Sequence, residues 1–264
     1  MNTEHKEVFT NTEKTTIKAQ LKVAVVILVI TSIIGLITSY TSKKPITNKP
    51  NTIQDQSLGV VKIEDKTAPY IDIVAEYPTE GTGSLFVEKN VQDIIKAFKN
   101  QNDFSKFAPQ ELKNFGISDE RRYQLYITYS STSGAHTISH RITTYTFTGG
   151  AHGNTFVETY TYTANEKLLS INDLFVDSEK GLELISKKTI ESIKNNPDYK
   201  DGLPTDWFDD GTAPTLQNYS TFELTKDSLV IIFQQYQALA YVYGNIEVRI
   251  PLKELSNVLK PEFK

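Results

Sequence analysis

The sequence contains no cysteine among its 264 residues, and only one methionine and one tryptophan. Without cysteine the chain forms no disulfide bond, and thiolate, redox and cysteine-ligated zinc chemistry are excluded. We therefore expect the ordered part of the protein to depend on its hydrophobic core for stability.

Familiar catalytic motifs are also missing. The sequence has no G-x-S-x-G, no H-E-x-x-H and no glycine-rich phosphate-binding loop. Two adjacent acids, Asp209 and Asp210, precede a glycine, which is typical of a solvated loop rather than of a glycosidase pair. We therefore predict no catalytic residue, no resident metal and no cofactor, and we expect that the chain is not an enzyme.

An excess of positive charge is absent as well. The formal net charge of the chain is −4, and beyond Lys44 there are 22 basic and 29 acidic residues. Nucleic-acid surfaces need clustered positive charge to displace counterions, so we expect no nucleic-acid partner. The acidic balance would suit a cationic partner.

One long apolar segment, Leu21–Tyr40, dominates the N-terminal part of the chain, and no charge occurs between Val23 and Tyr40. A helix of about 18–20 residues spans a bilayer core of about 30 Å. We therefore predict a transmembrane helix over residues 21–40 rather than a buried helix of a soluble domain. The segment is long for a signal peptide and no Ala-x-Ala site follows it, which favours an uncleaved signal anchor.

The predicted span divides the chain into unequal parts. Residues 1–20 are too few to form a core, and we expect them to be a short cytoplasmic tail. Four lysines precede the span and three follow it, which weakly favours this orientation. Residues 41–66 have the Lys, Asn, Thr and Pro content of a flexible linker. The remaining residues should form an exported domain.

Periodicity in the exported part predicts an α+β fold. We expect antiparallel sheets, each packed by a helix, in one compact two-part domain with subdomains at 67–165 and 166–264. Ser178 is the expected N-cap of the second helix. The predicted strands cover 70–77, 123–131, 138–148, 155–163, 219–225, 228–233 and 246–250, and the predicted helices cover 87–107, 178–195 and 252–259.

The histidines allow two interpretations. His136, His140 and His152 lie close in sequence and could form a zinc site with Glu158 or Asp209. The spacing matches no known zinc motif, so we favour exposed strand positions for His136 and His140. His152 is then a turn residue that hydrogen-bonds a backbone group, beside the glycines that permit a positive φ.

The segment from Gln234 to Gly244 is the best binding candidate, because Tyr236, Tyr241 and Tyr243 are separated by small or amide residues. Tyrosine combines a large apolar face with a hydroxyl and suits recognition of a protein or a sugar. Alternatively, these rings cap the core. Strand alternation would place Val242 in the core and both neighbouring tyrosines outward.

Four sequence motifs together resemble a bacterial extracytoplasmic family. The motifs are Gly149-Gly150-Ala151-His152, Asp173-Leu174-Phe175, the segment 233–244, and Ile250-Pro251-Leu252-Lys253-Glu254-Leu255. Residues 70–258 resemble the outer domain of RsiV-type anti-sigma factors, which are lysozyme receptors. They also resemble the non-catalytic N-terminal module of PdaC-type peptidoglycan deacetylases. The 20 residues before the span are fewer than the sigma-binding segment of the first group, and the residues of this chain leave no room for the catalytic domain of the second group. We therefore expect the binding or sensing domain without either output.

The resemblance and the predicted span together suggest a function. We expect a single-pass bacterial membrane protein whose C-terminal domain is extracytoplasmic and binds or senses a cell-wall component such as peptidoglycan, or a lysozyme-like protein. The alternatives are a metal-assisted envelope hydrolase and a structural protein of envelope assembly. The predicted binding residues are Tyr236, Tyr241, Tyr243, Gly244, Gly149, Gly150 and His152.

Overall fold

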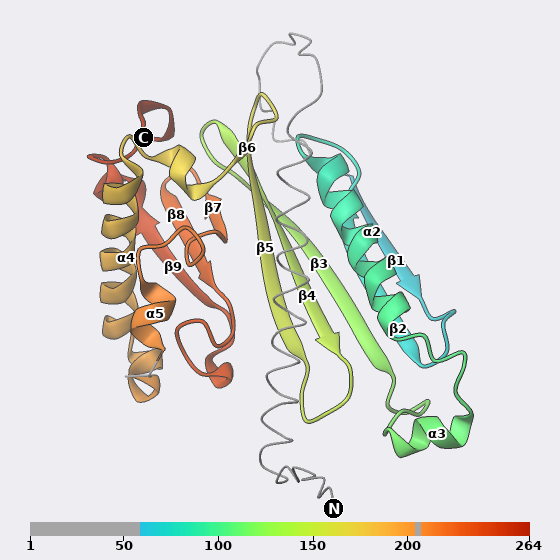
Figure 1. Ribbon diagram of the computed structural model, residues 1–264. Helices are drawn as coiled ribbons and strands as arrows, with labels where there is room; N and C mark the ends of the chain where they lie inside the picture. Colours follow the sequence, from blue (N-terminus) through green and yellow to red (C-terminus); the bar gives the residue numbers. More distant parts are fainter. Residues whose placement is uncertain (1–58, 204–206) are drawn as a thin grey trace, which may run out of the picture. The chain divides into compact units, whose positions relative to one another are not determined.

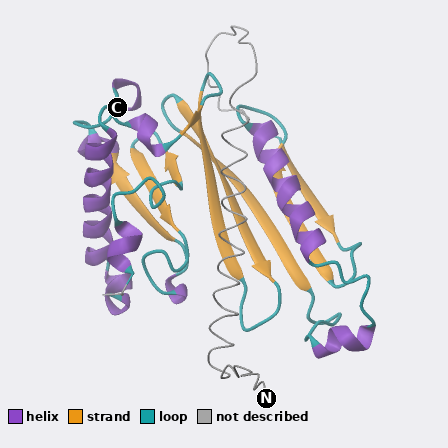
Figure 2. Cartoon of the chain, in the orientation of Figure 1, coloured by secondary structure: helices purple, strands orange, loops and turns teal. Residues whose placement is uncertain are grey.

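The computed structural model describes residues 59–203 and 207–264, which belong to one compact unit, Asn51–Lys264 (Figure 1). They form two β-sheets, each accompanied by a long helix (Figure 2), which confirms the mixed α+β class. Within these residues no helix is long and apolar enough to cross a membrane. The predicted span Leu21–Tyr40 and the predicted cytoplasmic tail lie outside the described residues.

The first sheet has six strands in the order β1-β2-β3-β4-β5-β6. Its neighbours are antiparallel except for β2 and β3, which are parallel. Our expectation of purely antiparallel sheets is therefore wrong for this sheet, because the chain between β2 and β3 returns through a helical crossover, as parallel pairing requires. The strands are β1 (Val60–Asp65), β2 (Ile71–Pro78), β3 (Tyr123–Ser133), β4 (Thr137–Phe147), β5 (Asn154–Thr163) and β6 (Leu168–Leu169).

The crossover contains α2 (Ser84–Gln101) and the short α3 (Pro109–Asn114). Helix α2 buries Val87, Val91 and Ile95 against the sheet, so the predicted amphipathic helix is confirmed. It begins and ends earlier than the predicted range 87–107, because the chain leaves the helix at Asn102, whose side chain binds the carbonyl of Phe98 at 2.8 Å.

Strand β1 corrects the predicted linker. We expected residues 41–66 to be flexible, but Val60–Asp65 pairs along β2 as the edge strand of the first sheet. Its alternation of exposed and half-buried residues is the cause, since Val61 and Ile63 pack on the core of this sheet. The low apolar content of the surrounding sequence hid this short pattern.

The second sheet has three antiparallel strands in the order β7-β8-β9. Its strands are β7 (Phe222–Leu224), β8 (Ser228–Phe233) and β9 (Ile246–Pro251). Helix α4 (Ser178–Asn195) packs on this sheet and has the predicted bounds. Its N-cap is Asp177, whose carboxylate accepts from the backbone N–H of Lys180 at 3.3 Å, and not the predicted Ser178.

Short helical turns complete the second half. The expected closing helix over 252–259 is only the 3-10 turn η4, because Ser256 ends it. Asp209 and Asp210, which we expected in a solvated loop, lie in the short helix α5. The predicted boundary at 165/166 lies just before β6, which still pairs with β5, and the two-part division remains a proposal. These elements are η1 (Ile171–Leu174), η2 (Pro197–Gly202), α5 (Phe208–Thr212), η3 (Tyr241–Tyr243), η4 (Leu252–Leu255) and η5 (Pro261–Phe263).

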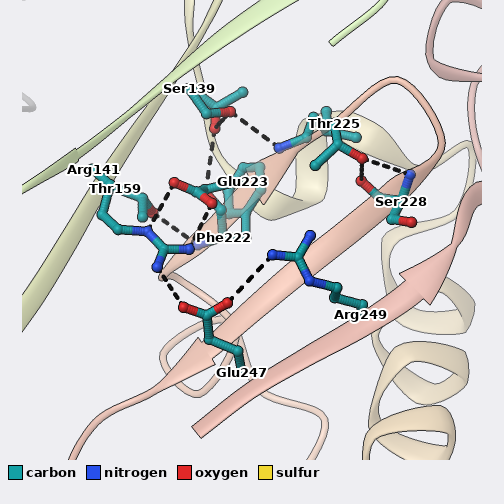
Figure 3. A network of polar contacts seen from close by, with 11 residues as sticks. Ser139, Arg141, Thr159, Phe222, Glu223, Thr225, Ser228, Glu247 and Arg249 are labelled. Carbon is teal, nitrogen blue, oxygen red and sulfur yellow. Dashed lines mark hydrogen bonds and ion pairs between the residues drawn. The ribbon is translucent and has the colours of Figure 1, made fainter. Parts of the chain in front are cut away.

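The two sheets meet between β4, β5 and β7. Val157 on β5 packs against Val230 and Ile232 of β8 in a small apolar cluster. Beside it, the N–H of Phe222 donates to the Thr159 hydroxyl at 2.8 Å, and the N–H of Leu224 donates to Ser139 Oγ at 3.0 Å (Figure 3). Hydroxyl side chains of the first sheet thus satisfy backbone groups of β7 that no strand covers.

An ion-pair network crosses the same junction (Figure 3). Arg141 of β4 binds both carboxylate oxygens of Glu223 on β7, through Nε at 3.0 Å and Nη2 at 2.6 Å. Its third nitrogen, Nη1, donates to Glu247 of β9, which also lies 3.6 Å from Arg249. One arginine of the first sheet therefore contacts two strands of the second.

Candidate binding site at the β4–β5 turn

Two of the motifs that carry the family resemblance come together in space. The turn that joins β4 to β5 contains His152 and Gly153, and the segment between β8 and β9 contains Tyr236 and Tyr241. The hydroxyl of Tyr241 donates to the carbonyl of Gly153 at 2.7 Å. Residues about 88 positions apart in sequence are thereby joined at one end of β5.

Three rings form the centre of this site. The imidazole of His152 stacks on Tyr241 with centroids 4.0 Å apart and an interplanar angle of 26°. Tyr236 lies on Tyr241 with centroids 5.7 Å apart. We call His152, Tyr236 and Tyr241 the tyrosine–histidine patch. His152 also bonds the backbone through Nδ1, 3.0 Å from the carbonyl oxygen of Gly153, as we predicted for a turn residue.

The patch presents aromatic surface to solvent. Tyr236 is 55% exposed and has a φ of 66°, a left-handed conformation that tyrosine rarely adopts. Such conformations persist where the surrounding structure holds them, and they are concentrated at functional sites. Tyr241 is half-buried and His152 is exposed.

The backbone around Tyr241 differs from our expectation. Tyr241–Tyr243 is a 3-10 turn and not an alternating strand, so the predicted core position of Val242 is wrong. Val242 is 81% exposed, and Tyr241 and Tyr243 are half-buried on either side of it. A 3-10 turn has three residues per turn, so its successive side chains do not alternate between two opposite faces as those of a strand do.

Tyr243 belongs to a different environment from the patch. Its ring lies edge-on to Tyr199 with centroids 5.9 Å apart, and it fills the space above Gly202. Tyr243 also packs against the core of the second sheet. The following Gly244 has a φ of 67° and returns the chain toward β9. Of these two predicted binding residues, Tyr243 therefore stabilises the segment by packing, and Gly244 shapes its backbone.

The glycines of the turn have positive φ, as expected: 83° at Gly149 and 94° at Gly150. The carbonyl of Gly150 accepts from Arg121 Nη2 at 2.6 Å. This contact ties the turn to the chain preceding β3. The glycines therefore shape the turn that presents His152, and their direct role in binding remains a prediction.

Two glutamines, which sequence reasoning missed, anchor the segment on β5. The side chain of Gln234 accepts from the N–H of Val157 at 3.0 Å and donates to the carbonyl of the same residue at 2.7 Å. Gln235 accepts from the N–H of Thr155 at 3.0 Å. The two amide side chains thus take the place of a neighbouring strand along the open edge of β5. The pair of consecutive glutamines after β8 is the sequence feature that could have indicated this anchor.

The histidines are not gathered as a zinc site would require. The expected exposure of His140 is wrong: it is fully buried, with Nε2 2.6 Å from the carbonyl of Thr82 and Nδ1 2.8 Å from the hydroxyl of Tyr129. His136 is exposed in the turn before β4. Across residues 59–203 and 207–264, no three His, Cys, Asp or Glu side chains form a group suited to a metal ion.

A carboxyl group lies between β5 and helix α2. Glu158 accepts from the hydroxyl of Tyr160 at 2.9 Å and from the side-chain amide of Asn90 at 3.3 Å. Burial raises the pKa of Glu158, although these two hydrogen bonds act in the opposite direction. In contrast, burial lowers the pKa of His140, which favours its neutral form.

Comparison with known families agrees with the resemblance inferred from the motifs. Residues 37–155 match the family described as deacetylase PdaC, and residues 172–253 match a protein family of unknown function, DUF3298. The chain is therefore similar to the PdaC family over its first matched segment and to the DUF3298 family over its second. The PdaC-type resemblance is confirmed.

A curated relative is the peptidoglycan-N-acetylmuramic acid deacetylase PdaC of Bacillus subtilis (strain 168), which is 28% identical over 182 residues. The alignment covers 64% of this chain and 38% of the relative. Our expectation that the chain is not an enzyme is contradicted by this similarity to an enzyme. The chain spans about two fifths of the length of the deacetylase.

Two solved structures share the fold. A DUF3298 family protein from Pseudomonas aeruginosa PAO1 has a TM-score of 0.51 and 17% identity, and the match covers 79% of this chain and 97% of that one. A DUF3298 family member from Bacteroides fragilis has a TM-score of 0.52 and 19% identity, covering 77% and 94%. The described fold is thus shared with proteins of Pseudomonas aeruginosa and Bacteroides fragilis.

Proposed function

We propose that this protein is an extracytoplasmic module that binds peptidoglycan glycan through the tyrosine–histidine patch. The two matched domains support a cell-wall-related role. The observation that best supports this binding site is the stacking of His152 on Tyr241, with the exposed Tyr236 beside them. The proposal includes membrane anchoring by the predicted span at residues 21–40.

The chemistry of the patch suits a sugar polymer. Aromatic faces offer apolar surface to the C–H groups of a pyranose ring, and the hydroxyl of Tyr236 is available for a polar contact at its rim. Tyr241 is fixed by its bond to Gly153, so little side-chain entropy is lost when a ligand is bound. A glycan strand offers the repeated faces that such a surface contacts.

The test is sedimentation of the full-length chain, purified in detergent, with insoluble peptidoglycan. Tyr236→Ala should weaken binding by about 1–3 kcal/mol, as expected of an aromatic anchor, and Tyr236→Phe should retain most of it. Leu85→Ala is the control, since Leu85 is a highly exposed apolar side chain at the start of α2, where the neighbouring Gly83 lies against Tyr162 near the other end of β5. Equal binding by Tyr236→Ala and the parent protein would reject the patch.

Two further measurements on the same preparation examine related activities. Acetate release from peptidoglycan tests whether the chain itself has the deacetylase activity named for its relative. Binding to a lysozyme tests the protein partner that the resemblance suggested, and the acidic balance of residues beyond Lys44 is compatible with a cationic partner. Lysozyme binding that persists in Tyr236→Ala would place that partner elsewhere on the surface.

A further inference from the structure

A separate pocket lies at the opposite end of β5 from the tyrosine–histidine patch. It has a volume of about 530 Å³, within the range of small-molecule sites. Four chain segments converge on it: the turn before β4, the turn between β5 and β6, η1, and the C-terminal residues. Its polar and charged lining residues include His136, Asn165, Lys167, Asp173, Lys260 and Glu262.

One aspartate fixes both lysines of the pocket wall. Lys167 Nζ donates to Asp173 Oδ1 at 2.7 Å, and Lys260 Nζ donates to the backbone carbonyl of Asp173 at 2.8 Å. The second carboxylate oxygen of Asp173 accepts from the N–H and the hydroxyl of Ser170 at 2.9 and 2.8 Å. Burial alone would raise the pKa of Asp173, but the bonds from Lys167 and Ser170 lower it, so it stays ionised.

The charges in this arrangement are unequally compensated. The carboxylate of Asp173 neutralises Lys167, whereas Lys260 is held by a neutral carbonyl and keeps two N–H donors and its positive charge. His136, in the turn before β4, lines the same pocket and offers a second hydrogen-bond donor. Glu262 supplies an acceptor, and Leu169 and Phe263 supply apolar lining.

We infer that this pocket binds a short peptide with a free carboxylate. Lys260 and His136 would receive the carboxylate, Glu262 and Asn165 would receive the peptide N–H groups, and Leu169 and Phe263 would contact small aliphatic side chains. The inference rests on the proposed function only for the source of the peptide, which would be the stem peptide of peptidoglycan. The pocket itself would accept a free peptide of the same chemistry.

Calorimetric titration of the full-length chain tests the ligand class. The probes are N-acetylmuramyl-L-alanyl-D-isoglutamine, the free dipeptide alanyl-glutamate and the neutral sugar chitotriose. Binding of both peptides supports the inference, and tighter binding of the muramyl compound than of the dipeptide identifies the cell wall as the source. Binding of the muramyl compound and chitotriose without the dipeptide is recognition of the sugar and overturns the inference. No heat from either peptide at millimolar concentration overturns it.

Substitutions locate the site. Lys260→Met should weaken peptide binding at least tenfold and His136→Gln several-fold, while Lys187→Met, an exposed lysine on α4, should leave it unchanged. Thermal unfolding separates lost binding from lost folding, and Lys260→Arg should restore binding. Unchanged affinity in a folded Lys260→Met overturns the inference.

The two proposals fail in different ways. The Tyr236→Ala variant should bind insoluble peptidoglycan more weakly and keep its affinity for the dipeptide. Protection from hydrogen exchange by the dipeptide should appear at residues 135–136, 163–167 and 260–263. Protection at the tyrosine–histidine patch instead would overturn the pocket assignment.

Discussion

Arg141 and Glu223 are joined by two parallel hydrogen bonds, of 3.0 and 2.6 Å, across the junction of the two sheets. The carboxylate side chain of Glu223 is only 4% exposed, so it depends on this one guanidinium for its charge balance. Bidentate pairs of this kind fix geometry as well as contributing energy. The orientation of the second sheet on the first thus depends on a contact between β4 and β7.

Removing one partner of this pair should be costly. We expect Arg141→Met to lower the free energy of unfolding by about 3–5 kcal/mol, because it leaves Glu223 buried without a countercharge. Arg249→Met is the control in the same network, since Arg249 is largely exposed and should cost less than about 1 kcal/mol. Urea denaturation measures both. Similar losses in the two variants would contradict the special role of Arg141.

Because the pKa of Glu158 is raised, its effect on stability should change with pH in the opposite direction to that of a salt-bridged carboxylate, whose pKa is lowered. The folded state holds the proton of Glu158 more tightly than the unfolded state does. Protonated Glu158 therefore contributes to the stability of the fold, and this contribution is fully present below the ordinary pKa of glutamate. It is lost as the pH rises through the folded-state pKa. We therefore expect Glu158→Gln, which keeps an acceptor for Tyr160 and Asn90, to be more stable than the parent protein at pH 7.

The measurement is the melting temperature of both proteins between pH 4 and pH 8. The advantage of Glu158→Gln should grow as the pH rises. Glu183→Gln, on an exposed part of α4, is the control and should show no such trend. A Glu158→Gln protein that is less stable at every pH would show that the carboxylate itself is required.

His140 should make the protein sensitive to acid. Its pKa is lowered by burial, so its contribution to stability is present above the ordinary pKa of histidine and is lost as the pH falls through the folded-state value. His140→Gln should be less stable than the parent at pH 7, because it cannot reproduce both contacts to Thr82 and Tyr129. The stability difference between the two proteins should shrink from pH 7 to pH 5. A constant difference would show that His140 does not titrate in this range.

Elements with a strong local pattern could be predicted from the sequence. Helix α4 and strand β8 have the predicted bounds, because a sustained helical period and a run of β-branched residues each leave one solution. The Asp173-Leu174-Phe175 motif also has a physical basis. Asp173 closes the turn on Ser170, and Phe175 packs against Gly181, where a Cβ would lie 2.2 Å from the ring.

Features that depend on distant contacts could not be predicted. The parallel pairing of β2 and β3 leaves no local mark, and the burial of His140 depends on a carbonyl 58 residues away. The candidate binding site could be predicted from the sequence only in part. Tyrosine content pointed to the segment 234–244, but the 3-10 turn that exposes Val242 and the stack of His152 on Tyr241 arise from the docking of this segment on β5.

The docking of segment 234–244 on β5 depends on Gln234. Val157 is buried, and both its N–H and its carbonyl bond to the side chain of Gln234. Gln234→Ala should therefore cost about 1–3 kcal/mol, because it leaves two buried backbone groups unpaired. Gln235→Ala is the matched control, since it removes a single bond to the N–H of Thr155 and should cost less.

Hydrogen exchange at the Val157 amide separates docking from folding. In Gln234→Ala this amide should exchange faster while the amides of β8 stay protected, because only the edge of β5 loses its partner. Peptidoglycan binding should fall in the same variant, since Tyr236 and Tyr241 are positioned by the segment that Gln234 anchors. If binding persists while the Val157 amide is unprotected, the ligand contacts a surface that does not require the docked segment, and the patch loses its structural basis.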